Sequence, residues 1–182
     1  MSNFASGVRV FPTSVEKLRE QAREIRKLVN LTEELFFPVL KYLAILQELK
    51  IDGFDFEIVD DNELPQNTFA VFKPQKCLLL IKNSIYEKAY KNDGFARFVI
   101  MHEICHFWLH RKQELALQRR NSYDHKPYED SEWQANTLAR EILAPIYMIK
   151  EDMTIENIAE KFGISKAAAE VVWDKFIALK QI

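Results

Sequence analysis

The sequence predicts an α+β fold in which a small sheet of three strands is set among helices. Two observations support this. Apolar residues recur with helical spacing before residue 50 and again after residue 83, whereas between them the pattern changes to short runs rich in β-branched and aromatic residues. These runs read FDFEIV, TFAVF and CLLLI, separated by the polar or proline-containing pieces DDNELPQN and KPQK. We expect three strands, at least two of them paired as a hairpin.

Two helices are expected before the sheet. The first follows Pro12, where Thr13 and Glu16 have the spacing of a capping box and apolar residues then recur on one face as far as Leu28. The second helical segment covers residues 31–50, and Pro38 is expected to start or kink it.

Further helices are expected after the sheet. The first is short and capped by Ser84 and Glu87, and the others cover Phe95 to about Lys112, Glu132–Leu143, and a pair within Thr154–Phe176 that turns at Gly163. We therefore divide the chain into a main domain, residues 1–149, and a helical extension, residues 150–182, that resembles a helix-turn-helix.

The composition is that of an ordinary globular protein. The chain has 182 residues, 48% hydrophobic and 29% charged, and its net charge of −2 gives no argument for binding nucleic acid or a membrane surface. Its two cysteines, Cys77 and Cys105, do not form a disulfide framework, which indicates a reducing compartment. The first residues lack the apolar run of a signal peptide, and no stretch approaches the ~20 apolar residues that span a bilayer. We expect a soluble cytoplasmic protein.

The stretch HEICH, residues 102–106, carries the main chemical signal. His102 and His106 are one helical turn apart, so both imidazoles project from one face and can reach the same ion. Glu103 then lies beside that ion, where it can take a proton from zinc-bound water. The flanking residues FVIM and FWL are apolar, so the helix is expected to be buried, where unpaired histidines would be costly.

Three possibilities arise for a third ligand. The metzincin pattern is excluded because its glycine is absent and His110 lies only four residues after His106. His110 could extend the row of histidines, but it is two turns from His102. The favoured candidate is Glu132, which opens the helix EWQANTLAREIL and could return alongside the first helix.

Asn136 and Cys105 are close to the candidate ligands in the sequence and are further candidates for a function. If Glu132 faces the metal, Asn136 lies one turn further on the same face, where its amide oxygen could accept a hydrogen bond from a ligand histidine. Cys105 is adjacent to a ligand and could be a sensitive thiol, but a small hydrophobic residue packed in the core is the favoured interpretation.

FARFVIMHEICHFWLH followed by EWQANTLAREILAP resembles the ImmA/IrrE family of intracellular zinc peptidases, from about Phe54 onward. The resemblance implies a zincin-like α+β core, zinc bound by His102, His106 and Glu132, and Glu103 as the catalytic base. The family's helix asparagine falls on Asn136. Where the family usually has Phe-Ala and LLMP, this chain has Leu-Ala and ILAP, which keeps the hydrophobic bulk. The resemblance also implies a protein substrate, typically a helix-turn-helix transcriptional repressor.

The C-terminal helical pair suggests a rival function, DNA binding. Between Glu151 and Phe176 there are three lysines, no arginine and six acidic residues, a local net charge of −3. The second helix, which would be the recognition helix, bears Ala167, Ala168, Ala169 and Glu170 and offers little to phosphates or bases. We therefore expect no direct contact with nucleic acid.

The segment after the HEICH helix is basic and carries several polar aromatic residues. Its cations could form the rim of a cleft, although a solvated surface is the default explanation; they are Arg111, Lys112, Arg119 and Arg120. Tyr123, His125 and Tyr128 are the nearby candidates for stabilising the oxyanion of the transition state.

The expected function is therefore that of a zinc-dependent endopeptidase, with an extended substrate lying along the edge of the small sheet. The alternative is a non-catalytic module that binds zinc and regulates a partner by protein–protein contact. The sequence alone does not separate the two.

Overall fold

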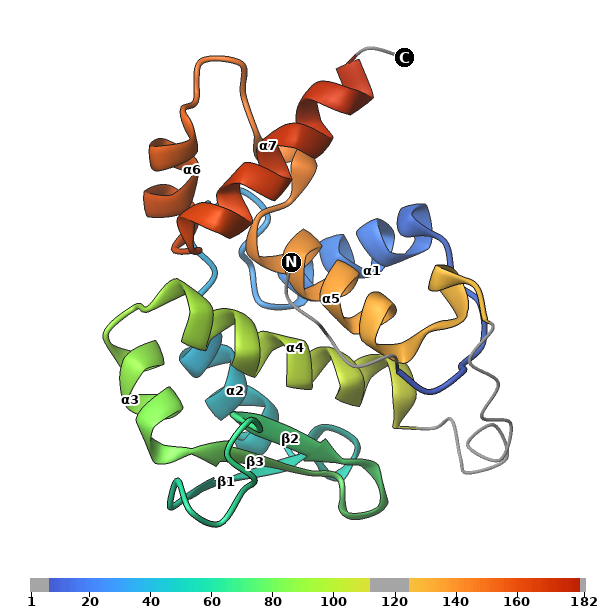
Figure 1. Cartoon of the computed structure of the whole chain (residues 1–182), viewed down its shortest axis with the longest axis vertical. Coiled ribbons are helices and arrows are strands. Elements are labelled where there is room, and N and C mark those ends of the chain that lie inside the picture. Colours follow the sequence, from blue (N-terminus) through green and yellow to red (C-terminus); the bar gives the residue numbers. More distant parts are fainter. Residues whose placement is uncertain (1–6, 112–124, 181–182) are drawn as a thin grey trace.

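Seven helices and three strands make up the described part of the chain, residues 7–111 and 125–180 of the computed structural model (Figure 1). This confirms the predicted α+β class. The helices are α1 Val15–Leu28, α2 Val39–Glu48, α3 Asn83–Tyr90, α4 Gly94–His110, α5 Ser131–Leu143, α6 Ile155–Phe162 and α7 Lys166–Lys180; the strands are β1 Asp55–Val59, β2 Ala70–Lys73 and β3 Leu78–Lys82.

The sheet has the order β1-β3-β2. β2 and β3 form the predicted hairpin, antiparallel with Phe72 opposite Leu79, whereas β1 runs parallel to β3 with Phe56 opposite Leu79. Leu79 and Ile81 of β3 are completely buried because this strand is central and covered. β2 is therefore an edge strand, and it packs against α4.

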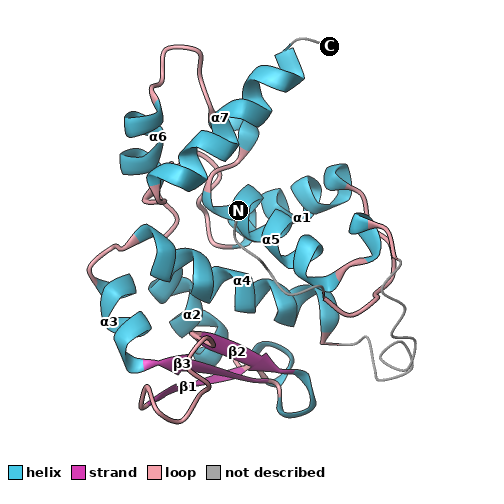
Figure 2. Ribbon diagram, viewed as in Figure 1, coloured by secondary structure: helices cyan, strands magenta, loops and turns pink. Residues whose placement is uncertain are grey.

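α4 lies between the sheet and α5, as Figures 1 and 2 show, and it contacts both. A helix that is apolar on all sides has to be covered on all sides. Ile100, Ile104 and Phe107 are fully buried on α4, as is Ile142 on α5. α1 packs against the other side of α5. The central helix of the molecule is thus the helix that carries HEICH.

The predicted ends of the helices are partly right. Pro38 precedes α2, as expected. The capping box at Thr13 is wrong by one residue, because Ser14 is the N-cap of α1 and accepts a hydrogen bond from the Lys17 amide at 3.3 Å. The predicted cap at Ser84 is also wrong. α3 begins at Asn83, and the Ser84 amide instead donates to the carboxylate of Asp61, 23 residues earlier.

The C-terminal helices have the expected turn. Gly163 has a left-handed backbone (φ 61°) at the end of α6, and the Ser165 hydroxyl accepts a hydrogen bond from the Ala168 amide at the start of α7. Phe162 and Val172 belong to the same hydrophobic core as the central helices, so a domain boundary at residue 149 stays a prediction. Across the two described ranges, none of the helices has the length and hydrophobicity to cross a bilayer.

Candidate metal centre

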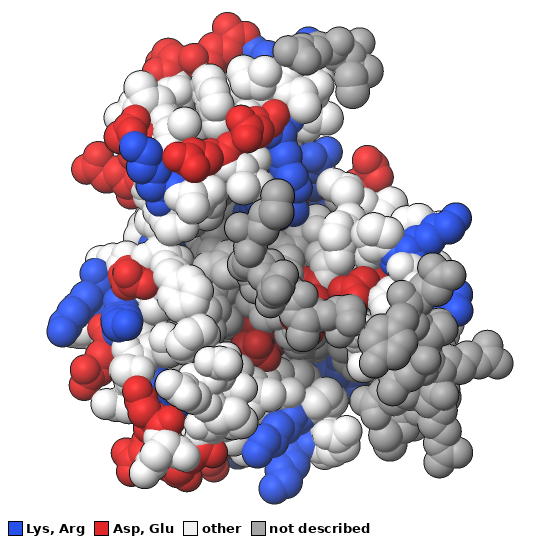
Figure 3. Space-filling model, in the orientation of Figure 1, with Lys and Arg blue, Asp and Glu red and all other residues white. Residues whose placement is uncertain are grey.

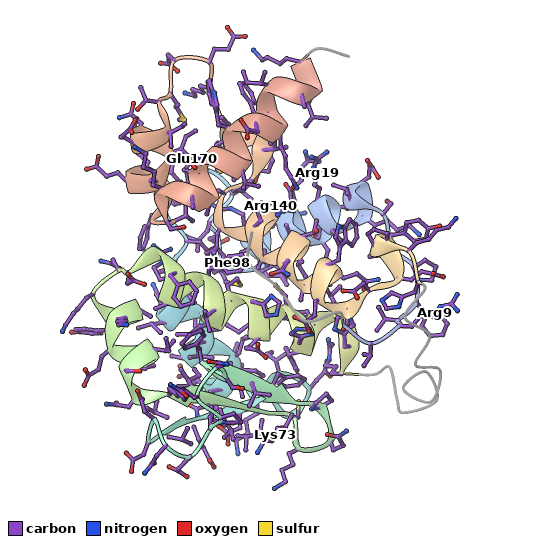
Figure 4. The ribbon with its side chains drawn as sticks, in the orientation of Figure 1. Arg9, Arg19, Lys73, Phe98, Arg140 and Glu170 are labelled. Atoms are coloured by element: carbon purple, nitrogen blue, oxygen red, sulfur yellow. The ribbon has the colours of Figure 1, made fainter. Side chains whose placement is uncertain are left out.

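α4, the helix that carries His102 and His106, has a side-chain cap at its N-terminus. Asp93 caps the helix by accepting a hydrogen bond from the Ala96 amide at 2.8 Å. Two turns later His102 is buried, 8% exposed, and His106 follows one turn further along the same face. Their rings are 4.6 Å apart between centroids. The ring of Phe98 (Figure 4), one turn before His102 on α4, lies 6.2 Å from the His102 ring between centroids.

The ligand atoms of His102, His106 and Glu132 converge. The two Nε2 atoms are 3.0 Å apart, and the Glu132 carboxylate oxygens lie 3.1 Å from His102 Nε2 and 3.2 Å from His106 Nε2. A tetrahedral zinc ion with bonds of ~2.0–2.1 Å separates its ligands by about 3.3 Å. The spacing and the chemistry of these donors therefore fit a divalent metal ion, and the three residues form a group that could hold one.

Electrostatics favours a negative Glu132 in this group. Burial raises the pKa of the Glu132 carboxyl, but hydrogen bonds with His102 and His106 outweigh it and hold that pKa well below its usual range. For His106, burial lowers the pKa, but the hydrogen bond with Glu132 and the charge of Glu103 outweigh burial and raise it. A carboxylate and two imidazoles whose ligand atoms face one another are a set that a cation would complete.

Glu103 lies beside the group and is held by the sheet. Its Oε2 accepts a hydrogen bond from the Phe72 amide of edge strand β2 at 2.8 Å, and its Oε1 lies 3.9 Å from His102 Nε2. Burial raises the pKa of the Glu103 carboxyl, an effect that the nearby histidines reduce. A carboxylate with a raised pKa, fixed next to two imidazoles, is suited to accepting and returning a proton.

Glu132 is positioned by the start of α5. Asp130 is the N-cap, with Oδ1 accepting from the Trp133 amide at 2.8 Å and Oδ2 accepting from the Gly7 amide at 2.8 Å. The chain near its N-terminus runs antiparallel to this turn, because Arg9 forms a β-bridge with Asp130. The N-terminal segment thus braces the turn from which Glu132 projects.

His110 does not join the ligand group among the described residues. Its Nδ1 lies 3.0 Å from His106 Nδ1 and its Nε2 lies 3.2 Å from Gln134 Oε1, so both ring nitrogens have partners within the protein. Burial, followed by the nearby charge of His106, lowers the pKa of His110 to about 4. The geometry favours Glu132 over His110 as the third ligand.

Asn136 and Cys105, the two neighbours of the ligands, differ in their surroundings. Asn136 Oδ1 and His102 Nδ1 are both buried and have no hydrogen-bond partner within the described part of the chain, so the predicted bond from a ligand histidine to Asn136 is not formed here. Cys105 is completely buried, and burial raises the pKa of its thiol well above the usual value. This agrees with the interpretation of Cys105 as a packed core residue.

The candidates for stabilising a transition state are spread out. Tyr123 lies outside the described residues. His125 Nε2 is 2.8 Å from Asp130 Oδ2, next to the cap of α5. Tyr128 is 40% exposed and lines an apolar cavity of about 510 Å³ with Trp133 and Val15. None of these contacts tests a catalytic role, which stays a prediction.

The basic segment is described only in part. Arg111 forms an ion pair with Asp52, with Nε 2.9 Å from the carboxylate, and this accounts for its charge without a substrate. The other predicted rim residues, Lys112, Arg119 and Arg120, lie outside the described residues.

Two contributors to the site were not found from sequence. One is the Phe72 amide, which carries no side-chain signal because the backbone makes the contact. The other is Gln134, two residues after Glu132 and therefore on a different face of α5 in the helical pattern. Only the return of α5 alongside α4 brings the Gln134 side chain to His110.

The fold and the ligand group define the class: an α+β protein with a zincin-like core and a candidate metal centre between two helices. The family model Peptidase M78, described as the IrrE N-terminal-like domain, matches residues 59–173, which include both helices of the site. The chain therefore belongs to this metallopeptidase family, and the resemblance seen in the sequence is confirmed. A search of curated proteins finds no match.

Proposed function

We propose that this chain is a cytoplasmic zinc-dependent endopeptidase of the HExxH-plus-glutamate type that cleaves a helix-turn-helix transcriptional repressor and so relieves repression. The convergence of His102, His106 and Glu132 within 4.8 Å, with Glu103 fixed alongside, is the observation that carries the proposal. Membership of a metallopeptidase family supports a protein substrate.

The roles of the residues follow from their positions. His102, His106 and Glu132 would hold zinc, which supplies Lewis acidity that polarises a peptide carbonyl and lowers the pKa of water. Glu103 accepts the proton of the attacking water and returns it to the leaving amine. The Phe72 hydrogen bond keeps one Glu103 oxygen in place and leaves the other for this transfer.

The edge strand is suited to hold the substrate. β2 pairs with β3 on one side only, and its Phe72 amide points away from β3 toward Glu103. An extended peptide added to this edge would be held by backbone hydrogen bonds, which recognise chain conformation and not sequence. Its scissile bond would then pass next to the ligand group.

The C-terminal helices favour a protein partner over DNA. Acidic side chains gather over α6 and α7 in Figure 3, and such a surface repels phosphates. The helices are therefore proposed as scaffold or docking surface for the substrate.

Glu103→Gln provides the test. The variant keeps the ligand group, so about one zinc per chain is expected by elemental analysis in both proteins, while cleavage of purified helix-turn-helix repressors, followed by mass spectrometry of new N-termini, should occur only with the wild type. A fully active Gln variant would refute the proposed role of Glu103. Zinc bound without any cleavage dependent on Glu103 would instead favour the non-catalytic binding module.

A further inference from the structure

A row of hydrogen bonds leads away from the metal group on the far side of His106. His106 Nδ1 lies 3.0 Å from His110 Nδ1, and His110 Nε2 lies 3.2 Å from Gln134 Oε1. The Gln134 amide nitrogen lies 2.8 Å from the main-chain oxygens of both Phe11 and Tyr128. The row thus joins α4, α5 and the N-terminal segment.

The direction of every bond in this row can be worked out from its far end. Two carbonyl oxygens can only accept, so the Gln134 nitrogen donates to both, and the orientation of its amide is determined. Gln134 Oε1 can then only accept, which places a proton on His110 Nε2.

The partners of His110 also determine which ring nitrogen of His106 carries a proton. His110 is 8% exposed and its side-chain partners are an amide and another imidazole, so among the described residues no carboxylate bonds to it to stabilise a cation. A neutral imidazole protonated on Nε2 has a lone pair on Nδ1. His106 Nδ1 must therefore donate to His110 Nδ1. Nε2, the atom that faces His102 and Glu132, is then the nitrogen that carries the lone pair when His106 is neutral.

We propose that Gln134 and His110 are positioning residues that fix the tautomer and the ring orientation of His106, so that His106 Nε2 presents its lone pair to the metal. The proposal rests on the proposed metal centre. Neither residue touches the metal or the substrate. Hydrogen bonds to the far nitrogen of ligand histidines typically change metal affinity by about 10–100-fold.

The other ligand histidine provides an internal contrast. His102 Nδ1 is buried and has no hydrogen-bond partner in the described residues. The chain therefore orients one ligand by a hydrogen-bonded row and the other by packing, including the Phe98 ring. Removing the row should affect His106 alone.

The test uses variants of His110 in the full-length chain. His110→Leu removes the acceptor, whereas His110→Asn keeps an amide oxygen that can take the place of Nδ1. The matched control is Trp108→Phe, which removes another hydrogen bond of α4, from Trp108 Nε1 to the Tyr42 hydroxyl at 2.9 Å, without touching the row.

Zinc affinity is measured by competition with a chromophoric chelator, and folding by urea denaturation of the metal-free proteins. We expect about 10–100-fold weaker zinc binding for His110→Leu, most of the affinity restored in His110→Asn, and wild-type affinity in Trp108→Phe. Wild-type zinc affinity in a folded His110→Leu protein would overturn the proposal.

A second readout needs neither activity nor a stable variant. Long-range ¹H–¹⁵N NMR of the metal-free wild type at pH 9 reports the tautomer of each neutral imidazole. The proton on Nδ1 of His106 and on Nε2 of His110 is the expected result, and the opposite tautomer of His106 contradicts the proposal. If the wild type binds no zinc at all, the proposed function fails, while the NMR result still decides whether the row sets the tautomer.

Discussion

Replacing Gly163 with alanine should destabilise the protein by more than the backbone alone accounts for. Gly163 has φ 61°, and a non-glycine residue in this left-handed region costs roughly 1–2 kcal/mol. An added Cβ would also lie 2.5 Å from Phe36 Cε2 and overlap Arg97 Nη1. Arg97 cannot move aside easily, because it is 1% exposed, stacks on Phe36 and donates to the Phe37 carbonyl at 2.6 Å.

The two contributions can be separated with Gly53. Gly53 has φ 80° but would place its Cβ in open space, so Gly53→Ala should cost only the backbone term, roughly 1–2 kcal/mol. Overpacking a rigid site adds about 1–3 kcal/mol, which brings Gly163→Ala to roughly 2–5 kcal/mol. At about 2–4 °C per kcal/mol, the melting temperature should fall by roughly 4–20 °C.

Urea denaturation followed by far-UV circular dichroism gives the free energies of unfolding. In the Arg97→Ala background the cost of Gly163→Ala should shrink toward that of Gly53→Ala, because the overlapping group is gone. Equal costs for Gly163→Ala and Gly53→Ala in the wild-type background would refute the reasoning. It would mean that Arg97 does not pack against the turn between α6 and α7.

Two further predictions concern stability. Asp130→Ala removes the cap of α5 and an acceptor for the Gly7 amide, so a loss of about 2 kcal/mol is expected in urea denaturation; a loss under 0.5 kcal/mol would contradict this brace. Burial, followed by the charge of Arg140, lowers the pKa of Lys175 to about 8, and the charge of Arg19 acts in the same direction; Figure 4 labels both arginines. Since the charged lysine is disfavoured in the folded state, its penalty is complete below pH 8 and disappears as pH rises toward the unfolded pKa near 10.5. Lys175→Met should therefore raise the melting temperature at pH 7, and a lower melting temperature would contradict the assignment.

The sequence was sufficient for the fold class because local signals agreed with it. Three short strands and the HEICH helix were each specified by their own periodicity, and the hairpin of β2 and β3 followed from the closeness of two runs. The parallel pairing of β1 with β3 had no local signal, since it depends on how the chain crosses over. The cap predicted at Ser84 failed because a distant residue, Asp61, supplies the acceptor for its amide.

In the candidate site, too, the features that depend on local spacing could be predicted, and those that depend on distant segments could not. The i, i+4 spacing of His102 and His106 is local, and it alone brings two ring nitrogens to 3.0 Å. The approach of Glu132 needed α5 to return beside α4, which the separation of the two segments permits but does not determine. Gln134 could not be predicted, because its role depends on two carbonyl oxygens from other segments.

The two candidate ligand histidines differ in the free energy that their burial costs the metal-free protein. His106 is part of a row in which each nitrogen has a partner, so it costs little in the metal-free protein. His102 Nδ1 and Asn136 Oδ1 are buried without partners, and each such atom costs roughly 1–3 kcal/mol. A core selected for stability alone would pair or remove these atoms. That they remain next to the ligand group indicates that the fold gives up stability at His102, whose Nε2 already faces His106 and Glu132.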